Sequence, residues 1–577
     1  LLTKEQDVLT FINQVSSVKI RDKSGVFIGA RMGRPEKAKM RKLKGSPQVL
    51  FPVGEEGGRL RSFQSALKVG TITGDFPVYE CSKCSSTTIY AVCENCGKHT
   101  QRKYFCDQCG EINKPSCQHG IAKPFSTQTI NIQHYFDRTL QKLKTKHFPD
   151  LIKGVRGTSN RDHTPESLMK GILRARHNIY VNKDGTTRYD ITQTPLTHFK
   201  PKEVGVDISK LRILGYDKDI EGKELVDKNQ VLELLPQDLI LPACDESPDP
   251  GADEVLFSVG KFIDDALVNL YDMDPYYRFK TKDDLIGQLT LVIAPHTSAG
   301  IVGRIIGFSQ TQGLFAHPIL HAATRRDCDG DESCVILLLD ALINFSRKFL
   351  PAHRGATQDA PLVLTSRLIP AEVDDMVFDL DIAWRYPLEF YNACLEYKYP
   401  WDVKIEQVSG RINNEHPYQG MGFTHKTSNI NDGVRCSAYK TLPSMKDKLA
   451  GQMELAEKIR AVKTSHVAEL VISKHFIKDI KGNLRKFSTQ QFRCVKCNEK
   501  FRRPPLLGKC TSCSGRIIFT ISEGSVVKYL HISIDMAEKY GLSLYLKQTL
   551  ELTKRRIESV FGKDPEKQEG LSKWVSP

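Results

Sequence analysis

Three aspartates, Asp327, Asp329 and Asp331, occupy alternate positions in the segment RRDCDGDES. Alternate side chains of an extended chain face one side, and Gly330 allows a tight turn between the last two, so the three carboxylates converge. Converging carboxylates resist joint ionisation and therefore favour a divalent cation, and ligands that are all oxygen suit Mg²⁺ or Mn²⁺. An EF-hand is excluded because the loop lacks Gly at its sixth position and Glu at its twelfth. The alternative is an acidic turn on the protein surface with no metal-binding or catalytic role.

The residues around the acids favour a built site. Arg325 and Arg326 place two fixed cations directly before the acids, as a site that handles phosphate requires. Residues 335–342 are apolar except for Asp340, and the chain then has the pattern of a helix up to Lys348. We therefore expect the acids to lead into a buried helix that holds them rigidly.

Other elements can be predicted around this segment. Residues 288–294 and 300–308 are rich in β-branched residues and predict strands of a small barrel. Residues 174–192 alternate in the manner of a hairpin about Lys183-Asp184-Gly185. Residues 445–472 predict a helix with one apolar face and one solvated face.

Cysteine spacing predicts three structural zinc sites. Eleven of the 16 cysteines fall into two clusters of paired spacing, and each Cys-x2-Cys pair can supply two thiolates to one tetrahedral zinc. The first cluster holds enough ligands for two closed sites, paired sequentially or, as the alternative, in a cross-braced manner; the second is a zinc ribbon. The expected sets are Cys81, Cys84, Cys93 and Cys96; Cys106, Cys109, Cys117 and His119; and Cys494, Cys497, Cys510 and Cys513.

Basic residues point to a polyanionic partner. Lys and Arg outnumber Asp and Glu by 83 to 68, which favours nucleic acid. Residues 30–45 hold seven basic residues against one acid, a density that indicates phosphate binding, with a solvated loop as the alternative. The candidate contacts to phosphate or nucleic acid are Arg31, Arg34, Arg325 and Arg326, with Arg502 and Arg503 in the ribbon loop.

Membrane segments are not expected. No apolar run reaches the roughly 18 to 20 residues that span a bilayer. The start of the chain shows no signal-peptide pattern. We expect an intracellular protein of the cytoplasm, associated with the nucleoid, and a chain truncated at its N-terminus because it begins with Leu.

Three stretches, residues 294–333, 387–400 and 30–45, resemble the large, catalytic subunit of archaeal family D DNA polymerases. The acid run also resembles the metal-binding motif of multi-subunit RNA polymerases, which lies on a double-psi β-barrel. The resemblance runs through nearly the whole chain. It implies an α+β multidomain fold, with a double-psi β-barrel catalytic core of the RNA-polymerase type, inserted zinc modules and a helical C-terminal region.

The resemblance also implies roles for single residues. Family D usually has Asn at the position of Asp327, so Asp329 and Asp331 are the expected metal ligands and Asp327 is a third candidate. By analogy with RNA polymerases, Lys37 and Lys39 should reach toward these acids. There they would neutralise phosphate charge that develops in the transition state.

The expected domain limits follow from the motifs and the resemblance. They are residues 1–78, the basic segment of a first double-psi barrel; 79–120, a double zinc module; 121–254, a connecting α/β region; 255–440, a second double-psi barrel with the aspartates; 441–490, a helical region; 491–520, the zinc ribbon; 521–562, a C-terminal helical region; and 563–577, a flexible tail.

The implied function is that of a DNA-directed DNA polymerase subunit in archaeal replication. Such a nucleotidyltransferase adds dNTPs to the primer 3′-hydroxyl of a primer–template DNA by a two-metal mechanism, and its proofreading exonuclease lies on a separate small subunit. Two alternatives stay open: an RNA-synthesising nucleotidyltransferase, and a non-catalytic zinc-containing scaffold that binds nucleic acid.

The C-terminal tail resembles the sliding-clamp-binding box of replication proteins. A short helical turn would put Leu571 and Trp574 on one face to fill an apolar pocket, while Gln568 supplies a hydrogen bond. Val575 completes the pattern. The alternative is a frayed end whose Trp574 packs on its own domain.

Overall fold

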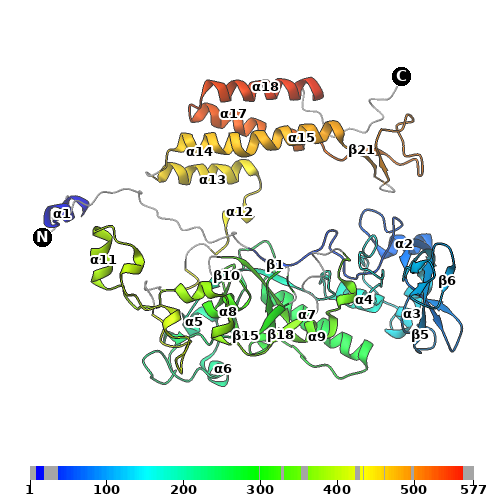
Figure 1. Cartoon of the computed structure of the whole chain (residues 1–577), viewed down its shortest axis with the longest axis horizontal. Helices are drawn as coiled ribbons and strands as arrows, with labels where there is room; N and C mark the ends of the chain where they lie inside the picture. The colour runs from blue at the N-terminus through cyan, green and yellow to red at the C-terminus, as the bar shows by residue number, and fades with distance from the viewer. Residues whose placement is uncertain are drawn as a thin grey trace. The chain divides into compact units, whose positions relative to one another are not determined.

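The computed structural model describes residues 8–17, 37–295, 297, 299–326, 330–352, 362–422, 429–432, 435–459, 462–495 and 499–562. The chain forms two compact units, drawn together in Figure 1. One comprises residues 32–441, and the other comprises 442–577 with residues 1–31. Within the described parts, no helix combines the length and the apolar character needed to cross a bilayer.

Six strands of the first unit close into a ring. In order around it they are β10 (Tyr189–Pro195), β16 (Gly313–Ala316), β13 (Asp238–Pro242), β15 (Ala299–Ser309), β14 (Leu289–Ile293) and β17 (Glu332–Leu337), which returns to β10. β10 runs parallel to β16 and β13 parallel to β15, and the other four pairings are antiparallel. β1 (Ala38–Met40) pairs with β10, and β18 (Val363–Thr365) pairs with β15. The result is a closed barrel with two added strands.

Alternating burial explains why these sequences form a barrel. Ile191, Val292, Ile301, Leu314 and Val335, each from a different strand, belong to one hydrophobic cluster. The neighbours of Val292, Leu314 and Val335 along their strands pack in other clusters on the opposite face, as the two-residue period of a strand requires. Both faces are therefore buried, which favours continuous apolar runs.

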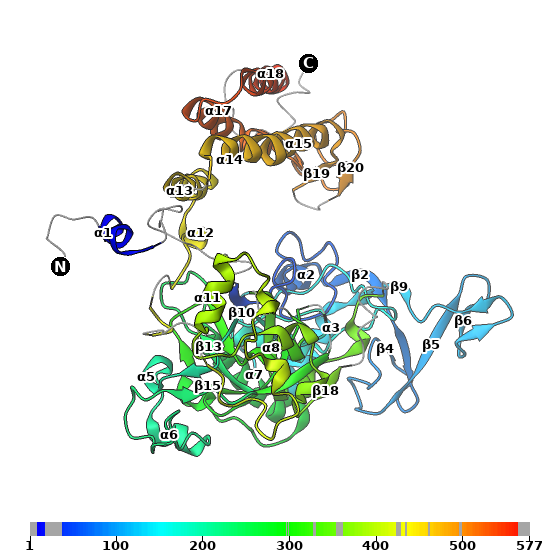
Figure 2. The same ribbon diagram turned by 60° about the vertical axis from the view of Figure 1, so that its left-hand side comes forward.

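Helix α7 (Ala252–Tyr271) is the long helix of this unit, and it lies against β1, β13 and β17. Its buried residues recur at three- and four-residue intervals, from Val255 through Val259 to Ile263, which is the spacing of one helix face. α4 (Leu168–Arg176) and α9 (Leu338–Asn344) pack against it. Figure 2 shows α7 and the shorter α8 (Pro318–Ala323) beside the strands.

The prediction of a helix directly after the acids is wrong. The acids lead first into strand β17, and the helix α9 begins only at Leu338. Residues 333–337 are fully buried, and a short apolar run of this kind satisfies a strand buried on both faces as well as a helix. The ring also takes β10 and β13 from residues before 255, in the expected connecting region.

Only the second half of the expected hairpin about residues 183–185 forms a strand. Residues 182–188 make a buried polar turn, in which Asn182 N–H donates to the Thr186 carbonyl at 2.8 Å. Gly185 has φ +93°, and a Cβ there would lie 2.4 Å from the carbonyl oxygen of Asn344. The polar residues alternate because they serve buried hydrogen bonds, not because one face meets water.

Smaller elements surround the barrel. β2 (Thr71–Phe76) pairs with β9 (Ser126–Asn131) beside α2 (Phe63–Val69) and α3 (Ile132–Lys142). The cysteine-rich segment forms β3 (Val78–Cys81), β4 (Thr87–Thr88), β5 (Thr100–Cys106), β6 (Gly110–Ile112), β7 (Ser116–Cys117) and β8 (Gly120–Ile121). A second hydrophobic cluster holds β11 (His198–Phe199), α5 (Pro201–Val204), α6 (Ile208–Ile213) and β12 (Leu232–Glu233), and α11 (Leu388–Leu395) and α12 (Ala438–Thr441) follow.

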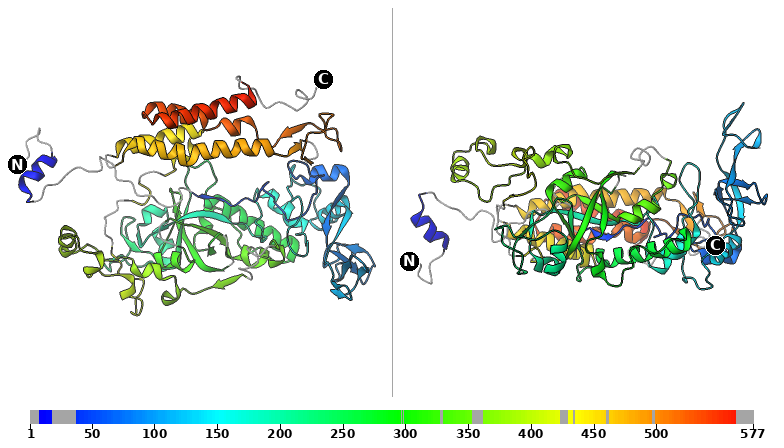
Figure 3. Two further views of the ribbon diagram at one scale, coloured as in Figure 1. Left: turned by 45° about the horizontal axis from the view of Figure 1, so that its top comes forward. Right: turned by 90° about the horizontal axis from the view of Figure 1, so that it is seen from below.

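The second unit is helical with a small ribbon. Its helices are α1 (Val8–Val15), α13 (Met445–Lys458), α14 (Thr464–Leu470), α15 (Ile477–Thr489), α16 (Glu523–Val527), α17 (Leu530–Lys539) and α18 (Leu544–Phe561). A π-helical turn, Val471–Phe476, joins α14 to α15, so the helix expected over 445–472 is two helices. Figure 3 shows α14, α15, α17 and α18 side by side. The ribbon is β20 (Lys500–Phe501), β19 (Phe492–Cys494) and β21 (Ile517–Phe519).

Candidate functional site

Helix α8 leads directly to the two arginines that precede the acids. The N-cap His317 accepts a hydrogen bond from Ile319 N–H through Nδ1 at 3.2 Å, and Pro318 occupies the first helical position. After the helix, Arg325 has φ +55°, a left-handed conformation that costs a residue with a side chain about 1 kcal/mol. This residue turns the chain out of the helix at the start of the acid run.

Asp331 lies at the entrance to β17, while Asp327 and Asp329 lie outside the described residues. Gly330 has φ +96°, as the expected tight turn requires. Gln193 N–H on β10 donates to the carbonyl oxygen of Asp331 at 2.8 Å, which ties the acid to the barrel. The Asp331 carboxylate is 43% exposed and lies 4.0 Å from Arg326 Nη1. It is therefore open to solvent beside a fixed cation.

Lys37 is held against the same edge of the barrel. Its N–H donates to Thr192 Oγ1 at 3.1 Å, and its carbonyl accepts from Thr192 N–H at 2.7 Å. Its ammonium forms an ion pair with Glu332, the residue after Asp331. Glu332 is opposite Thr192 in the β10–β17 register, so the three side chains share one face.

Lys39 lies further along β1. It is exposed between buried Ala38 and Met40, and it is opposite Asp190 on β10. Asp190 forms an ion pair with Arg41, at 3.2 Å to both carboxylate oxygens. The structure thus brings Lys37 to the residue beside the acids, and sets Lys39 two residues further along the same face.

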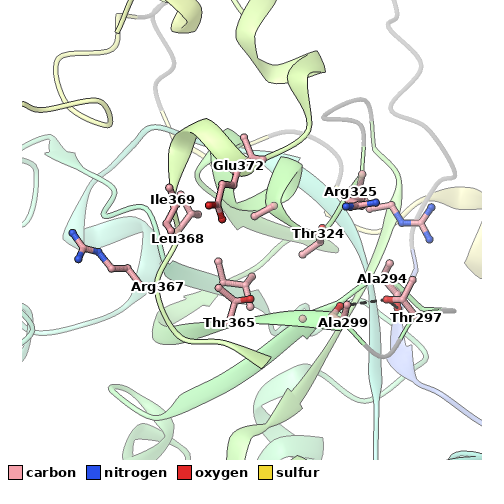
Figure 4. A pocket seen from close by; sticks show the side chains of 15 residues that line it. Ala294, Thr297, Ala299, Thr324, Arg325, Thr365, Arg367, Leu368, Ile369 and Glu372 are labelled. Carbon is pink, nitrogen blue, oxygen red and sulfur yellow. Dashed lines mark hydrogen bonds between the residues drawn. The ribbon is translucent and has the colours of Figure 1, made fainter. Parts of the chain in front are cut away.

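A cavity of about 320 Å³ lies beside Arg325 and Arg326, the two residues that precede the acid run in sequence. Arg325 and Arg326 line one side, and Arg367 and Glu372 come from the segment after β18 (Figure 4). The remaining wall is formed by hydroxyl groups and apolar side chains: Thr297, Thr324, Thr365, Ile301, Leu368, Ile369 and Val373. Guanidinium groups and hydroxyls suit phosphate oxygens, and the apolar wall suits a flat or aliphatic group.

Two histidines beneath this site are uncharged. His317 and His321 on and before α8 are fully buried, and burial lowers the pKa of each to about 4. His321 Nε2 lies 3.2 Å from the carbonyl oxygen of Thr194 on β10, so it donates as a neutral ring. Both histidines therefore serve packing, and the cations at the site are arginine and lysine.

The cysteine-rich module gathers the two sequential sets that the spacing predicts. The ligand atoms of Cys81, Cys84, Cys93 and Cys96 lie within 4.8 Å of one another, as do those of Cys106, Cys109, Cys117 and His119. His119 Nδ1 is 3.0 Å from Cys109 Sγ. Hydrogen bonds from the backbone N–H groups of Cys109 and Gln108 lower the pKa of Cys106 to about 6, which favours the thiolate that binds metal. The first set is the more buried.

The ribbon of the second unit brings Cys494, Cys510 and Cys513 together within the same distance, and Cys497 lies outside the described residues. Arg502 and Arg503 are exposed directly after β20. Other expected residues also lie outside the described ranges: Arg31, Arg34, Gln568, Leu571, Trp574 and Val575.

Sequence reasoning missed Glu332, Gln193 and Arg367. Glu332 adjoins the acid run, so its position in sequence could have suggested it. Gln193 and Arg367 carried no local signal, because they reach the site through strand pairing and chain reversal.

The fold and the site together define a mixed α+β chain with a closed six-stranded barrel, Asp331 at its edge and cysteine-rich modules. Residues 144–448 match the model of the DNA polymerase II large subunit DP2 catalytic domain, residues 2–114 match that of its central domain, and residues 488–547 match the zinc finger domain of DNA polymerase-epsilon. The chain belongs to the family of the DNA polymerase II large subunit.

Curated relatives agree with this assignment. The DNA polymerase II large subunit of Archaeoglobus fulgidus is 46% identical over 99% of this chain and 50% of its own length. Those of Nanoarchaeum equitans and Pyrococcus furiosus are 47% and 44% identical over 96% of this chain, and over 48% and 44% of their own lengths. The chain spans about half the length of the curated relatives it matches. The zinc-finger match and the cysteine clusters together support zinc sites.

Proposed function

We propose that this chain carries the nucleotide-adding site of a DNA-directed DNA polymerase, which extends a primer on a DNA template. The observation that carries the proposal is the convergence of Asp331, Arg326 and Lys37 at one edge of the barrel, in a chain of this family. An acid that can hold metal, flanked by two cations that can hold phosphate, is the minimum that phosphoryl transfer requires.

The donor set fits Mg²⁺ or Mn²⁺. Asp331 is exposed, its backbone is fixed by Gln193, and the residues that would hold the metals are Asp331 and Asp329, with Asp327 as a third candidate. When bound, two such ions activate the primer 3′-hydroxyl and stabilise the leaving pyrophosphate. Neutralisation by metal also removes the repulsion among neighbouring carboxylates.

The chain's own cations have separate roles in this proposal. Arg325 and Arg326 line the cavity, so they would hold the triphosphate of the incoming dNTP while its remaining part lies against Leu368 and Ile369. Lys37, and less directly Lys39, would counter negative charge that develops on the phosphates during transfer. Lys37 is held before substrate arrives, because its backbone is bonded to β10 and its ammonium pairs with Glu332.

The barrel itself is proposed to be of the double-psi type found in RNA polymerases. Its closed ring of six strands, with parallel pairs β10–β16 and β13–β15 among antiparallel ones, supports this type. A first barrel built on residues 1–78 stays a prediction.

Partners and zinc complete the proposal. The three cysteine sets would each hold a structural zinc, with Cys497 as the fourth ligand of the ribbon. On the resemblance to family D, a proofreading exonuclease is assigned to a separate small subunit, and the tail at residues 568–575 to a sliding clamp.

The test is primer extension by the complete subunit with its partner. Asp331→Ala should abolish nucleotide addition while primer–template binding survives, because the metals serve chemistry more than affinity. Asp274→Ala, which removes an exposed acid after α7, is the matched control. Extension retained by Asp331→Ala would remove the assignment. Running the wild type with dNTPs and then rNTPs distinguishes a DNA polymerase from an RNA-synthesising relative, and no extension with either would favour the scaffold.

A further inference from the structure

Two segments far apart in sequence build a second basic surface beyond β1. Residues 41–62 fold back on themselves, so that the Arg61 guanidinium donates to the carbonyl of Lys44. Residues 153–156 then pack alongside: Gly154 N–H donates to the Arg61 carbonyl at 2.9 Å, and Gly54 N–H to the Arg156 carbonyl at 3.2 Å. The fold thus joins two segments about a hundred residues apart.

The scaffold beneath this surface is rigid. Residues 47–53 are buried without interruption, and Val49, Phe51 and Val53 belong to the main hydrophobic cluster. Backbone hydrogen bonds run in both directions between 48–54 and 153–156. A solvated basic loop would have neither a buried backbone nor such hydrogen bonds. The basic side chains here therefore extend from a packed backbone.

The charge on this surface is one-sided. Residues 42–61 and 151–156 hold six basic residues against two acids, Glu55 and Glu56. Glu55 pairs with Arg156 at 3.3 Å. Partial burial lowers the pKa of Arg61, and the charge of Arg156 lowers it further. Cations are therefore crowded closely enough to oppose one another, a cost that a polyanionic ligand would relieve.

The surface is continuous with the candidate active site. Lys37 pairs with Glu332 beside Asp331, β1 carries Lys39, and the chain after β1 continues to Lys42 and Lys44. Alternate residues of an extended segment are about 6.6 Å apart, so Lys37 and Lys39 lie about that far apart on one face. The basic residues thus continue from Lys37, beside Asp331, to Lys44, whose carbonyl accepts from the Arg61 guanidinium.

We propose that the basic face formed by Lys42, Lys44, Arg59, Arg61, Lys153 and Arg156 binds the phosphate backbone of duplex DNA. This deepens the proposed function and rests on it only for the identity of the duplex as primer–template. Duplex DNA is a rigid rod of regular negative charge, which matches cations presented by a packed backbone better than a flexible or locally acidic partner does. The contacts carry no sequence information, as a polymerase requires.

The test measures binding, not catalysis. Arg61→Gln/Arg156→Gln is prepared in the full chain, and its affinity for a labelled blunt duplex is measured without divalent ions at several salt concentrations. Each lost phosphate contact should lower the slope of log K against log salt by about 0.9, so the double variant should lose about 1.8. At about 0.1 M salt this corresponds to roughly 60-fold weaker binding, shrinking toward none near 1 M.

The matched control is Lys202→Gln/Lys218→Gln, which removes the same charge from exposed positions in the segment of the second hydrophobic cluster. It should leave the slope unchanged. If Arg61→Gln/Arg156→Gln fails to fold, Lys44→Gln/Lys153→Gln replaces it, because neither of these side chains is buried.

The possible outcomes distinguish the duplex-binding face from the proposed polymerase activity. An unchanged slope, an equal loss in the control, or a loss confined to single-stranded DNA would overturn the duplex-binding face, even if primers are still extended. A reduced slope in a protein that extends no primer would keep the face and remove the proposed polymerase activity.

Discussion

Neutralising Glu332 should slow nucleotide addition only while Lys37 is present. Glu332 receives the Lys37 ammonium, and Lys37 is anchored to Thr192 through both its N–H and its carbonyl. Glu332 therefore acts as a positioning residue, which sets where the ammonium lies relative to Asp331. Glu332→Gln keeps the shape of the side chain and removes the charge that holds the ammonium.

The magnitude follows from the burial of the pair. Two unit charges 4 Å apart interact by about 4 kcal/mol at an effective dielectric constant near 20. The Lys37 and Glu332 side chains are 35% and 12% exposed, so solvent screening and ordering offset much of this interaction. About 1.4 kcal/mol remains, which is a tenfold change in rate. Lys37→Ala should cost more, about 10² to 10³, the scale of one lost preorganised electrostatic contact.

The assay is a double-mutant cycle in single-turnover primer extension, with the affinity for primer–template measured separately. Lys37→Ala/Glu332→Gln should match Lys37→Ala alone, because Glu332 has no ammonium left to position. Asp190→Asn is the control, since it neutralises the acid of the Arg41 pair on the same face, and it should change the rate by about twofold or less.

Two results would refute this reasoning. If Glu332→Gln still slows the reaction tenfold in the Lys37→Ala background, Glu332 acts through β17 and not through Lys37. If Lys37→Ala changes only the salt dependence of DNA binding and leaves the single-turnover rate alone, Lys37 is a backbone contact and not a catalytic group.

Three further expectations concern stability and partners. Cys93→Ser, in the buried cysteine set, should release one zinc per chain and lower the thermal midpoint more than Cys109→Ser in the exposed set; equal midpoints would contradict the difference in burial. Burial lowers the pKa of His321 from 6.5 to about 4, so the contribution of the neutral ring to the free energy of unfolding is complete above pH 6.5 and falls by about 3 kcal/mol as the pH drops toward 4. The urea midpoint of His321→Gln should lack that part of the pH dependence. A peptide of residues 567–577 should bind the cognate sliding clamp and lose binding with Trp574→Ala, whereas equal binding by both peptides would remove this role.

The predictable parts of the fold are those whose local pattern has one solution. The runs at 288–294 and 300–308 become β14 and β15 because β-branched residues with alternate packing suit a strand. Cys-x2-Cys spacing likewise has few alternatives, so the sequential sets come together. The apolar run at 333–337 is compatible with either a helix or a strand, and its burial on both faces favours the strand.

The candidate site divides in the same way. The acid run with Asp331 and the adjacent Arg326 could be singled out by residue type and spacing, and Lys37 by the resemblance to RNA polymerases. Gln193 could not, because it reaches Asp331 through the pairing of β10 with β17, and Arg156 could not, because it comes near Arg61 through packing of the segment after α3. Such contacts are decided by tertiary structure, and neither periodicity nor composition encodes them locally.

The register of β10 links the chemistry to residues that take no part in it. Asp190 and Thr192 point to one face of the strand, whereas Tyr189 and Ile191 point to the other and pack in the main hydrophobic cluster, and all four are buried. A slip by one residue would exchange the two faces and place the Asp190 carboxylate in that apolar cluster, away from Arg41. Because that cost fixes the register, it also fixes Lys37 beside Glu332, although about 300 residues separate them in sequence. The hydrophobic core of the barrel thus determines where the ammonium meets the acid run.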